Sequence, residues 1–284
     1  MIQTVARAAR CAAAVIREPT YVRPGHFYSP VPSRADVEEV LLRNHPVDPA
    51  GVDLREADQL SLAKKLGPMW RDTPLDGRYT VGENRMFPLS DAAVYSALLR
   101  TEPPARVVEV GSGYSSAIAL DTADRWGIDI EFTFIEPYPQ RLLDLLSTDD
   151  DRRVMLRRER VQDTPQDVFD ELSGGDILFI DSTHVMKAGS DVGHLVFNVL
   201  PRLHRGVRVH FHDVFWPFEY PEEWLRERRG WNETYLLHAF LAFNGAYEID
   251  LFNDWLWRVN PDVPRCYLPE SAAERPGGLW LRRK

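Results

Sequence analysis

From residue 106 onward, short runs of apolar residues alternate along the chain with longer segments of helical character. The apolar runs predict strands at 106–110, 130–136, 154–160, 176–181 and 207–212. The intervening segments predict helices near 114–126, 138–147, 164–173 and 189–203. A parallel pair of strands needs a long crossover, usually a helix, so this alternation predicts an α/β fold with a doubly wound, mostly parallel sheet.

The pattern changes after the fifth predicted strand. Residues 232–243 form an amphipathic repeat that predicts one more helix, and 247–252 predicts a strand. A further apolar run, Leu279-Trp280-Leu281, follows Gly277-Gly278 and predicts the last strand. We expect these two final strands to pair in antiparallel orientation at one edge of the sheet.

The first 88 residues have a different character and predict an accessory region. Residues 1–17 predict an Ala-rich amphipathic helix that packs on the body of the protein or on a second chain, which would make the N-terminal region a site of homo-oligomer contact. Residues 18–35 combine prolines with aromatic residues and predict an extended, ordered arm. We therefore expect an accessory region at 1–88 and a second domain at 89–284.

Composition narrows the classes of function. The chain has 284 residues, a net charge of -9 and only two cysteines. An acidic chain is a poor partner for nucleic acid, because phosphate binding needs clustered Lys and Arg. Two distant cysteines do not make a disulfide framework, and the longest N-terminal apolar stretch is too short for a signal peptide or a membrane span. These features predict a cytoplasmic protein with a small-molecule partner.

A glycine-containing turn follows the first predicted strand. Gly111 and Gly113 allow a ligand to approach the backbone closely, because glycine has no side chain and tolerates positive φ. Glu136 ends the second predicted strand, where a carboxylate can accept both hydroxyl groups of a ribose. This combination predicts a site for a cofactor that contains a nucleoside.

Two departures from the dinucleotide pattern indicate which cofactor this is. Ser116 stands where dinucleotide-binding folds have a third glycine. Glu109, inside the first strand, would repel a pyrophosphate but would suit an amine or a cationic sulfur. Both features favour S-adenosylmethionine over NAD.

The stretch Ser90 to Trp216 resembles the class I S-adenosylmethionine-dependent methyltransferases in its strand-end motifs, Val107 to Gly113 and Ile135-Glu136-Pro137. More narrowly, Asp176 to Trp216 is similar to the O-methyltransferases that modify sugars and other natural products. The resemblance implies a seven-stranded sheet ending in an antiparallel pair. It also implies that the cofactor is bound by Glu109, Gly111, Ser112, Gly113, Tyr114, Ser115, Ser116 and Glu136, with Gln162 and Asp163 at the adenine.

A second group of polar residues closes the fourth and fifth predicted strands. Asp181 and Asp213 should meet at one edge of the sheet and could hold a divalent cation that binds the acceptor hydroxyl. We include His212 as a third ligand. The resemblance implies three oxygen ligands and Mg²⁺, whereas imidazole suits softer metals, so a two-carboxylate site and an Mn²⁺-like ion both stay open.

His184 follows Asp181 by three residues. At this position, the O-methyltransferases that the chain resembles have a residue that accepts the proton of the substrate hydroxyl group. An imidazole can take a proton near neutral pH, although a histidine there could equally cap the next helix. His210 is interpreted as a core residue. Aromatic residues between 214 and 235 predict a lid, and we assign Trp216 and Tyr235 to the acceptor.

The sequence thus predicts an S-adenosylmethionine-dependent O-methyltransferase that acts on a hydroxyl group of a small molecule, such as a glycoside or another natural product. One alternative is an NAD-dependent oxidoreductase. Another is an iron oxygenase that uses His210, His212 and Asp213 as ligands, although adjacent strand residues point to opposite faces. A third is a catalytically silent subunit that binds S-adenosylmethionine without turnover.

Overall fold

The computed structural model describes residues 20–43, 49–81, 84 and 86–284. The predicted helix at 1–17 lies outside these residues. The chain divides into two compact units, one made of Met1–Asn44 with Pro221–Gly230 and the other of His45–Tyr220 with Trp231–Lys284. Within the described ranges, no helix is both long and apolar enough to cross a membrane.

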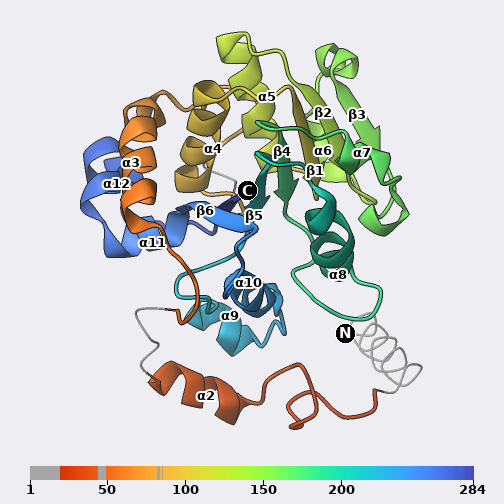
Figure 1. Ribbon diagram of the computed structural model, residues 1–284, viewed down its shortest axis with the longest axis vertical. Coiled ribbons are helices and arrows are strands. Elements are labelled where there is room, and N and C mark those ends of the chain that lie inside the picture. The colour runs from red at the N-terminus through yellow and green to blue at the C-terminus, as the bar shows by residue number, and fades with distance from the viewer. Residues whose placement is uncertain (1–19, 44–48, 82–83, 85) are drawn as a thin grey trace, which may run out of the picture. The chain divides into compact units, whose positions relative to one another are not determined.

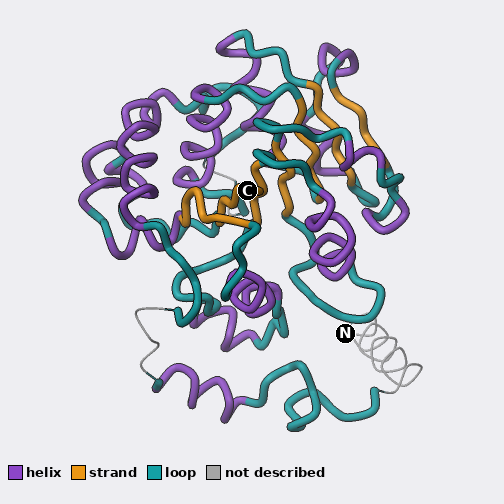
Figure 2. Tube along the Cα trace, viewed as in Figure 1, coloured by secondary structure: helices purple, strands orange, loops and turns teal. Residues whose placement is uncertain are grey.

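The larger unit is built on one seven-stranded sheet with the order β3-β2-β1-β4-β5-β7-β6 (Figures 1 and 2). Its strands are β1 (Arg106–Val110), β2 (Glu131–Ile135), β3 (Val154–Arg157), β4 (Ile177–Ile180), β5 (Arg208–Phe211), β6 (Tyr247–Phe252) and β7 (Leu279–Arg283). The first five strands pair in parallel, whereas β7 is antiparallel to both β5 and β6. The predicted doubly wound sheet with a C-terminal antiparallel pair is therefore confirmed.

Helices and short helical turns connect these strands. The α-helices of the larger unit are α3 (Glu56–Leu66), α4 (Leu89–Thr101), α5 (Tyr114–Trp126), α6 (Gln140–Leu145), α7 (Asp167–Asp170), α8 (Asp191–His194), α10 (Glu233–Leu241), α11 (Asn253–Val259) and α12 (Asp262–Tyr267). The 3-10 turns are η1 (Gly67–Asp72), η2 (Thr148–Arg152), η3 (Val161–Asp163), η5 (Leu200–Arg202) and η6 (Pro269–Ser271), and η4 (Leu195–Val199) is a π-helix. The helix predicted at 189–203 is therefore three consecutive segments, α8, η4 and η5.

The core is formed where helices cover the central strands. All four residues of β4 are buried, which explains why this strand is uniformly apolar instead of alternating. Helices α3, α4 and α5 pack one against the next (Figure 1). Residues 45–88 thus share a unit with the sheet, whereas the sequence analysis assigned them to the accessory region.

A group of buried ion pairs fixes the antiparallel edge of the sheet. The guanidinium group of Arg208 in β5 is 2.9 Å from a carboxylate oxygen of Asp250 and 3.0 Å from one of Glu102. Asp250 lies in a β-bulge of β6, between two residues that pair with consecutive residues of β7. Arg282 of β7 contacts the same two carboxylates. A register slip would separate these charges, so the network stabilises one pairing of β6 and β7.

The described part of the smaller unit contains α2 (Arg34–Leu42) and α9 (Glu222–Glu227). Ser33 caps α2 through its hydroxyl group, which accepts a hydrogen bond from the amide of Asp36. The two helices pack together, and Arg228 donates a hydrogen bond to the carbonyl oxygen of Pro32. Residues 20–33 contain turns and bends and no strand, and carry three exposed aromatic side chains, Tyr21, Phe27 and Tyr28.

The turn after β1 joins three strands at their carboxyl ends. The amide of Gly111 donates to the carbonyl oxygen of Ile135 at the end of β2, and the amide of Asp181 after β4 donates to that of Val110. Gly111 has a φ of +80°, and a Cβ at this position would lie 1.8 Å from the carbonyl oxygen of Asp181. Only glycine fits this turn, because both the backbone angle and the neighbouring strand exclude a side chain.

We expect Gly111→Ala to lower the free energy of unfolding by about 2–5 kcal/mol, the sum of left-handed strain and overpacking. The matched control is Gly127→Ala. Gly127 also has a positive φ, of +62°, but nothing lies within 4 Å of its Cβ position, so only strain of about 1 kcal/mol should remain. Denaturant unfolding measures both values. Equal losses in the two variants would contradict the close contact of Gly111 with Asp181.

Candidate active site

The carboxyl ends of β1, β2 and β4 border a cavity of about 380 Å³ in the larger unit. Ligands of open α/β sheets bind at this edge, next to the point where the strand order reverses. The lining residues include Gly111, Glu136, Gln162, Asp181 and Lys187. A second cavity, of about 490 Å³, is lined by Arg106, Phe132 and Arg157 among others and contains none of the predicted site residues.

Glu136 lies beside the glycine-containing turn, as its assignment to a ribose requires. One carboxylate oxygen is 3.4 Å from the amide nitrogen of Ser112, and the other accepts a hydrogen bond of 2.8 Å from the amide of Tyr138. The end of β2 and the turn after β1 therefore form one continuous wall of the cavity.

Glu109 is completely buried in β1, directly behind the turn. One carboxyl oxygen accepts a hydrogen bond from the hydroxyl group of Ser115, and the other has no hydrogen-bond partner among the described residues. Burial raises the pKa of Glu109 to about 8, and the nearby carboxylates of Asp181 and Glu136 add to this effect. A cationic ligand bound next to this carboxyl group would stabilise its ionised form.

The serine side chains of the turn have partners inside the protein. The hydroxyl group of Ser116 accepts a hydrogen bond of 3.0 Å from the amide of Gly113 and so caps α5. Ser115 donates to Glu109, and Tyr114, the first residue of α5, packs against the core. The serine that replaces the third glycine is thus explained by helix capping, a role that the sequence analysis did not assign to it.

The two residues predicted at the adenine are placed differently. Gln162 in η3 lines the cavity, and its side-chain amide donates to the carbonyl oxygen of Gly189. Asp163 is not among the residues that line the cavity, and its carboxylate forms an ion pair of 2.7 Å with Arg160. Of the two residues, only Gln162 therefore borders the cavity, and the adenine assignment stays a prediction for both.

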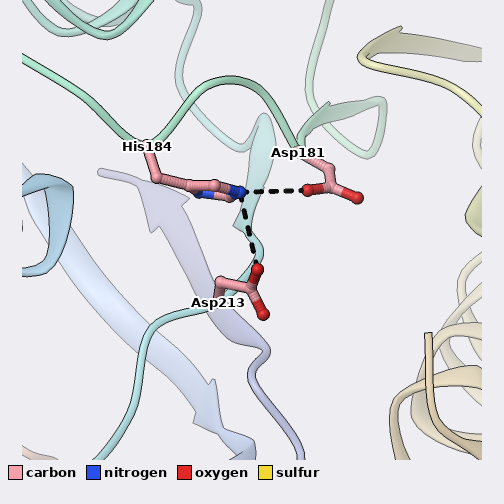
Figure 3. Close-up of side chains that lie close together, drawn as sticks. All are labelled: Asp181, His184 and Asp213. Carbon is pink, nitrogen blue, oxygen red and sulfur yellow. Dashed lines mark ion pairs between the residues drawn. The ribbon is translucent and has the colours of Figure 1, made fainter. Parts of the chain in front are cut away.

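Asp181, His184 and Asp213 form a compact cluster beside the cavity (Figure 3). One ligand atom from each residue lies within 4.8 Å of the other two. The Nε2 atom of His184 is 3.5 Å from a carboxylate oxygen of Asp181 and 3.5 Å from one of Asp213. As Figure 3 shows, the imidazole points between the two carboxylates.

Two left-handed residues create this arrangement. β5 ends at Phe211, and Asp213 has a φ of 59°, so its side chain no longer follows the alternation of the strand. His184 also has a φ of 59°. Such values are uncommon outside glycine but are several-fold enriched for Asp and His. The turn after each strand therefore aims its side chain at the cluster.

Glu233, the first residue of α10, completes the surroundings of His184. Its carboxylate lies 2.9 Å from Nδ1 of the imidazole, and both side chains are buried. The sequence analysis missed this residue, because nothing in the local pattern connects it to His184 across the intervening chain. The pair leaves Nε2 of His184 facing the two aspartates.

The charges in the cluster depend on one another. Burial alone would lower the pKa of His184, but hydrogen bonds to Asp181 and Glu233 and the charge of Asp213 raise it well above its usual value. Burial raises the pKa of Asp213, although the imidazoles of His212 and His184 oppose this. These interactions therefore favour the protonated form of the His184 imidazole when no other cation occupies the cluster.

The compact cluster does not include the predicted third ligand, His212. Its Nε2 atom is 3.7 Å from a carboxylate oxygen of Asp213, so a ligand role for His212 stays a prediction. The same Nε2 atom is 3.1 Å from the carbonyl oxygen of Met86, and the ring packs against Phe87. His210 is buried between Phe179 and Trp280, as expected for a core residue, although neither ring nitrogen has a hydrogen-bond partner among the described residues. The described residues therefore do not assemble the iron site of the alternative hypothesis.

The aromatic residues of segment 214–235 divide into core and site residues. Trp216 is only 5% exposed and packs against Phe252, so the structure does not support its prediction as an acceptor contact. Tyr235 is 42% exposed, and its hydroxyl group donates to Glu219. Trp231 is the aromatic residue beside the cluster, with its ring centroid 4.5 Å from that of His184. Trp216 and its neighbour Phe218 thus contribute to the core, whereas residues 221–230 belong to the smaller unit.

Comparison with known proteins identifies the central segment. Residues 108–214 match a protein family described as a methyltransferase domain. These residues contain the turn after β1, Glu136, and all three members of the cluster. The resemblance to methyltransferases found in the sequence is therefore confirmed for this segment.

One relative is an uncharacterised protein of Archaeoglobus fulgidus, which is 36% identical over 132 residues, or 42% of this chain. The chain spans 60% of that protein's length. A solved structure of CmcI with magnesium and S-adenosylmethionine has a TM-score of 0.41 and 19% identity, over 69% of this chain and 71% of that one. The Podospora anserina methyltransferase PaMTH1, bound to S-adenosylhomocysteine, has a TM-score of 0.44 and 15% identity, over 85% of this chain and 99% of that one.

The raised pKa of Glu109 predicts a dependence of stability on pH. Between the usual pKa of a glutamate and about 8, the folded protein holds a proton that the unfolded chain releases, so this residue makes stability fall as pH rises through that range. The glutamine in Glu109→Gln cannot ionise, so this variant should not lose stability over this pH range through residue 109. We expect the variant to gain thermal stability relative to the wild type between about pH 5 and pH 9.

The control is Ser115→Ala, which keeps the carboxyl group and removes its hydrogen bond. Because this hydrogen bond lowers the pKa of Glu109, the alanine variant should lose stability with pH at least as steeply as the wild type. Parallel stability curves for the wild type and Glu109→Gln would show that Glu109 does not hold the proton.

Proposed function

We propose that this protein, whose residues 108–214 match a family described as a methyltransferase domain, transfers a methyl group from S-adenosylmethionine to a hydroxyl group of a small molecule. One observation carries the proposal: the cavity beside the glycine-containing turn is continuous with a cluster of two carboxylates and an imidazole, because Asp181 belongs to both. A donor site and an acceptor-activating site therefore share one edge of the sheet.

The residues of the cavity fit the donor. Glu136 is placed for the ribose hydroxyl groups, and Gly111 leaves the backbone open to a ligand. Glu109 lies buried behind the turn and suits a positively charged ligand better than a pyrophosphate. Gln162 lines the part of the cavity assigned to the adenine. When bound, S-adenosylmethionine supplies a methyl group on a cationic sulfur.

The cluster fits a divalent cation. Asp181 and Asp213 each offer a carboxylate oxygen and His184 offers Nε2, all close enough to bind one ion. Glu233 accepts from the other ring nitrogen and so would hold the histidine in the tautomer that a metal requires. A mixed set of two oxygens and one nitrogen suits Mn²⁺ or a similar ion better than Mg²⁺. A bound cation would orient the acceptor oxygen and lower the pKa of its hydroxyl group.

His184 is better suited to be a ligand than the general base assigned to it in the sequence analysis. An imidazole that is already protonated cannot accept a proton from an alcohol. A divalent cation would replace the charge of that proton, so binding of the cation and release of the proton are linked. In this proposal the carboxylates of Asp181 and Asp213 compensate the charge of the bound cation. Trp231 packs against one side of the His184 imidazole.

The function is tested with methyl-labelled S-adenosylmethionine and a panel of small hydroxyl compounds, including glycosides and phenols. We expect transfer of label to at least one hydroxyl compound and formation of S-adenosylhomocysteine. Binding of the donor without transfer to any compound would favour the catalytically silent subunit. Binding of NAD in place of the donor would favour an oxidoreductase.

The metal assignment predicts different effects for the residues of the cluster. Asp181→Asn should abolish binding of Mn²⁺ measured by calorimetry, because a ligand is lost. Glu233→Gln removes only the partner of Nδ1 and should weaken binding by about 10- to 100-fold, as is usual for residues that orient a ligand. Binding of Mn²⁺ by the wild type should also strengthen as pH rises, since His184 must lose its proton.

The matched control is Glu219→Gln, which removes a carboxylate of the same sequence region without touching the cluster. Its affinity for Mn²⁺ should equal that of the wild type. A similar loss in Glu219→Gln and Glu233→Gln would mean that total charge, and not the contact with His184, determines affinity. If Asp181→Asn still binds Mn²⁺ with the affinity of the wild type, the proposed metal site is wrong.

A further inference from the structure

The side chain of Arg141 in α6 packs against Gly113 of the glycine-containing turn. The sequence does not indicate this contact. A Cβ on Gly113 would lie 3.0 Å from Cδ and 3.8 Å from Nη1 of Arg141. The aliphatic part of the arginine therefore packs on the backbone of Gly113, in the space that a side chain would fill. One nitrogen of its guanidinium group lies beside Gly113, the residue that precedes α5.

Arg141 lies near the carboxylate of Asp181 but forms no ion pair with any acidic residue that the structure describes. Burial raises the pKa of Asp181, but the imidazoles of His212 and His184 and the guanidinium group of Arg141 together hold it below its usual value. Arg141 is thus within electrostatic range of the cluster, yet among the described residues no carboxylate lies within ion-pair distance of it. Arg160, which lines the cavity, is by contrast paired with Asp163.

An arginine without a carboxylate partner, packed on the turn of a site rich in acidic residues, is well placed to bind an anionic group of a ligand. The proposed donor carries only one such group, the α-carboxylate of its methionine portion. Its amino group and sulfur are positively charged and suit Glu109 and Asp181. A planar guanidinium group can bind a carboxylate through two parallel hydrogen bonds.

We propose that Arg141 binds the α-carboxylate of the methionine portion of the donor and so positions it along the turn after β1. This inference rests on the proposed function. Arg141 is not among the residues that line the cavity, whereas Lys187 and Arg160 are. Arg160 is paired with Asp163, so Lys187 is the competing cation. It lies in the loop that ends at Ser190, whose hydroxyl group accepts from the amide of Lys187, and so belongs to the part of the cavity that contains Gln162 and Gly189. Arg141 contacts the turn itself.

The test compares two ligands that differ in the amino acid portion, which carries the carboxylate. S-adenosylhomocysteine has the amino acid portion, whereas 5′-methylthioadenosine keeps the adenosine and the thioether but lacks the amino acid. Arg141→Gln should raise the Kd of S-adenosylhomocysteine by about tenfold or more, the usual effect of losing a charged hydrogen bond. The Kd of 5′-methylthioadenosine should stay within about twofold of the wild-type value, because the adenosine end is unchanged.

Lys187→Gln is the matched control, because it removes the same charge from a residue that lines the cavity, and it should leave the ratio of the two Kd values unchanged. Arg141→Lys keeps the charge without the planar fork and should give an intermediate ratio. Thermal unfolding checks that each variant is folded, which we expect because the side chain of Arg141 is exposed.

Three outcomes overturn the inference. Arg141→Gln could weaken both ligands equally, it could weaken neither, or Lys187→Gln could be the variant that changes the ratio. If the wild type binds neither ligand, the proposed function itself fails. If the wild type binds both ligands and Arg141→Gln does not separate them, only the role of Arg141 is wrong.

Discussion

The contact between Gly111 and the carbonyl oxygen of Asp181 determines how the rest of the site can be built. It brings the turn after β1 against the end of β4, with no room for a side chain between them. The residues of the turn and those of the cluster therefore cannot move independently. A donor held on the turn and an acceptor held at the cluster would share one rigid support, which is what an in-line transfer of a methyl group requires.

Uncompensated negative charge is the second property of this edge. Glu109, Glu136, Asp181, Asp213 and Glu233 all lie at or behind it, and most are partly or fully buried. Such a group of carboxylates is stable only with protons or cations nearby. In the protein alone, the protons on Glu109 and His184 supply part of this compensation. The site is therefore prepared for positively charged ligands, and Arg141 is an exception that suits an anionic group.

Much of the fold and part of the site could be predicted from the sequence, because both depend on where strands end. Asp181 and Glu136 directly follow apolar runs, and parallel strands bring their carboxyl ends to one edge. The grouping of His184 with the two aspartates could not be predicted, since His184 and His212 both follow strands. Left-handed backbone at His184 and Asp213, together with the approach of Glu233 from α10, brings His184 to the two carboxylates. The sequence likewise predicts that Trp216 contacts the acceptor, but its side chain is buried in the core.

The buried carboxyl group of Glu109 has a consequence for how the donor is taken up. A ligand that brings positive charge next to a protonated glutamate favours its ionisation, so complex formation should expel this proton into the solvent. The heat of binding would then include the protonation enthalpy of whatever buffer receives the proton. Under the proposed function, Glu109 would therefore couple binding of the donor to release of a proton.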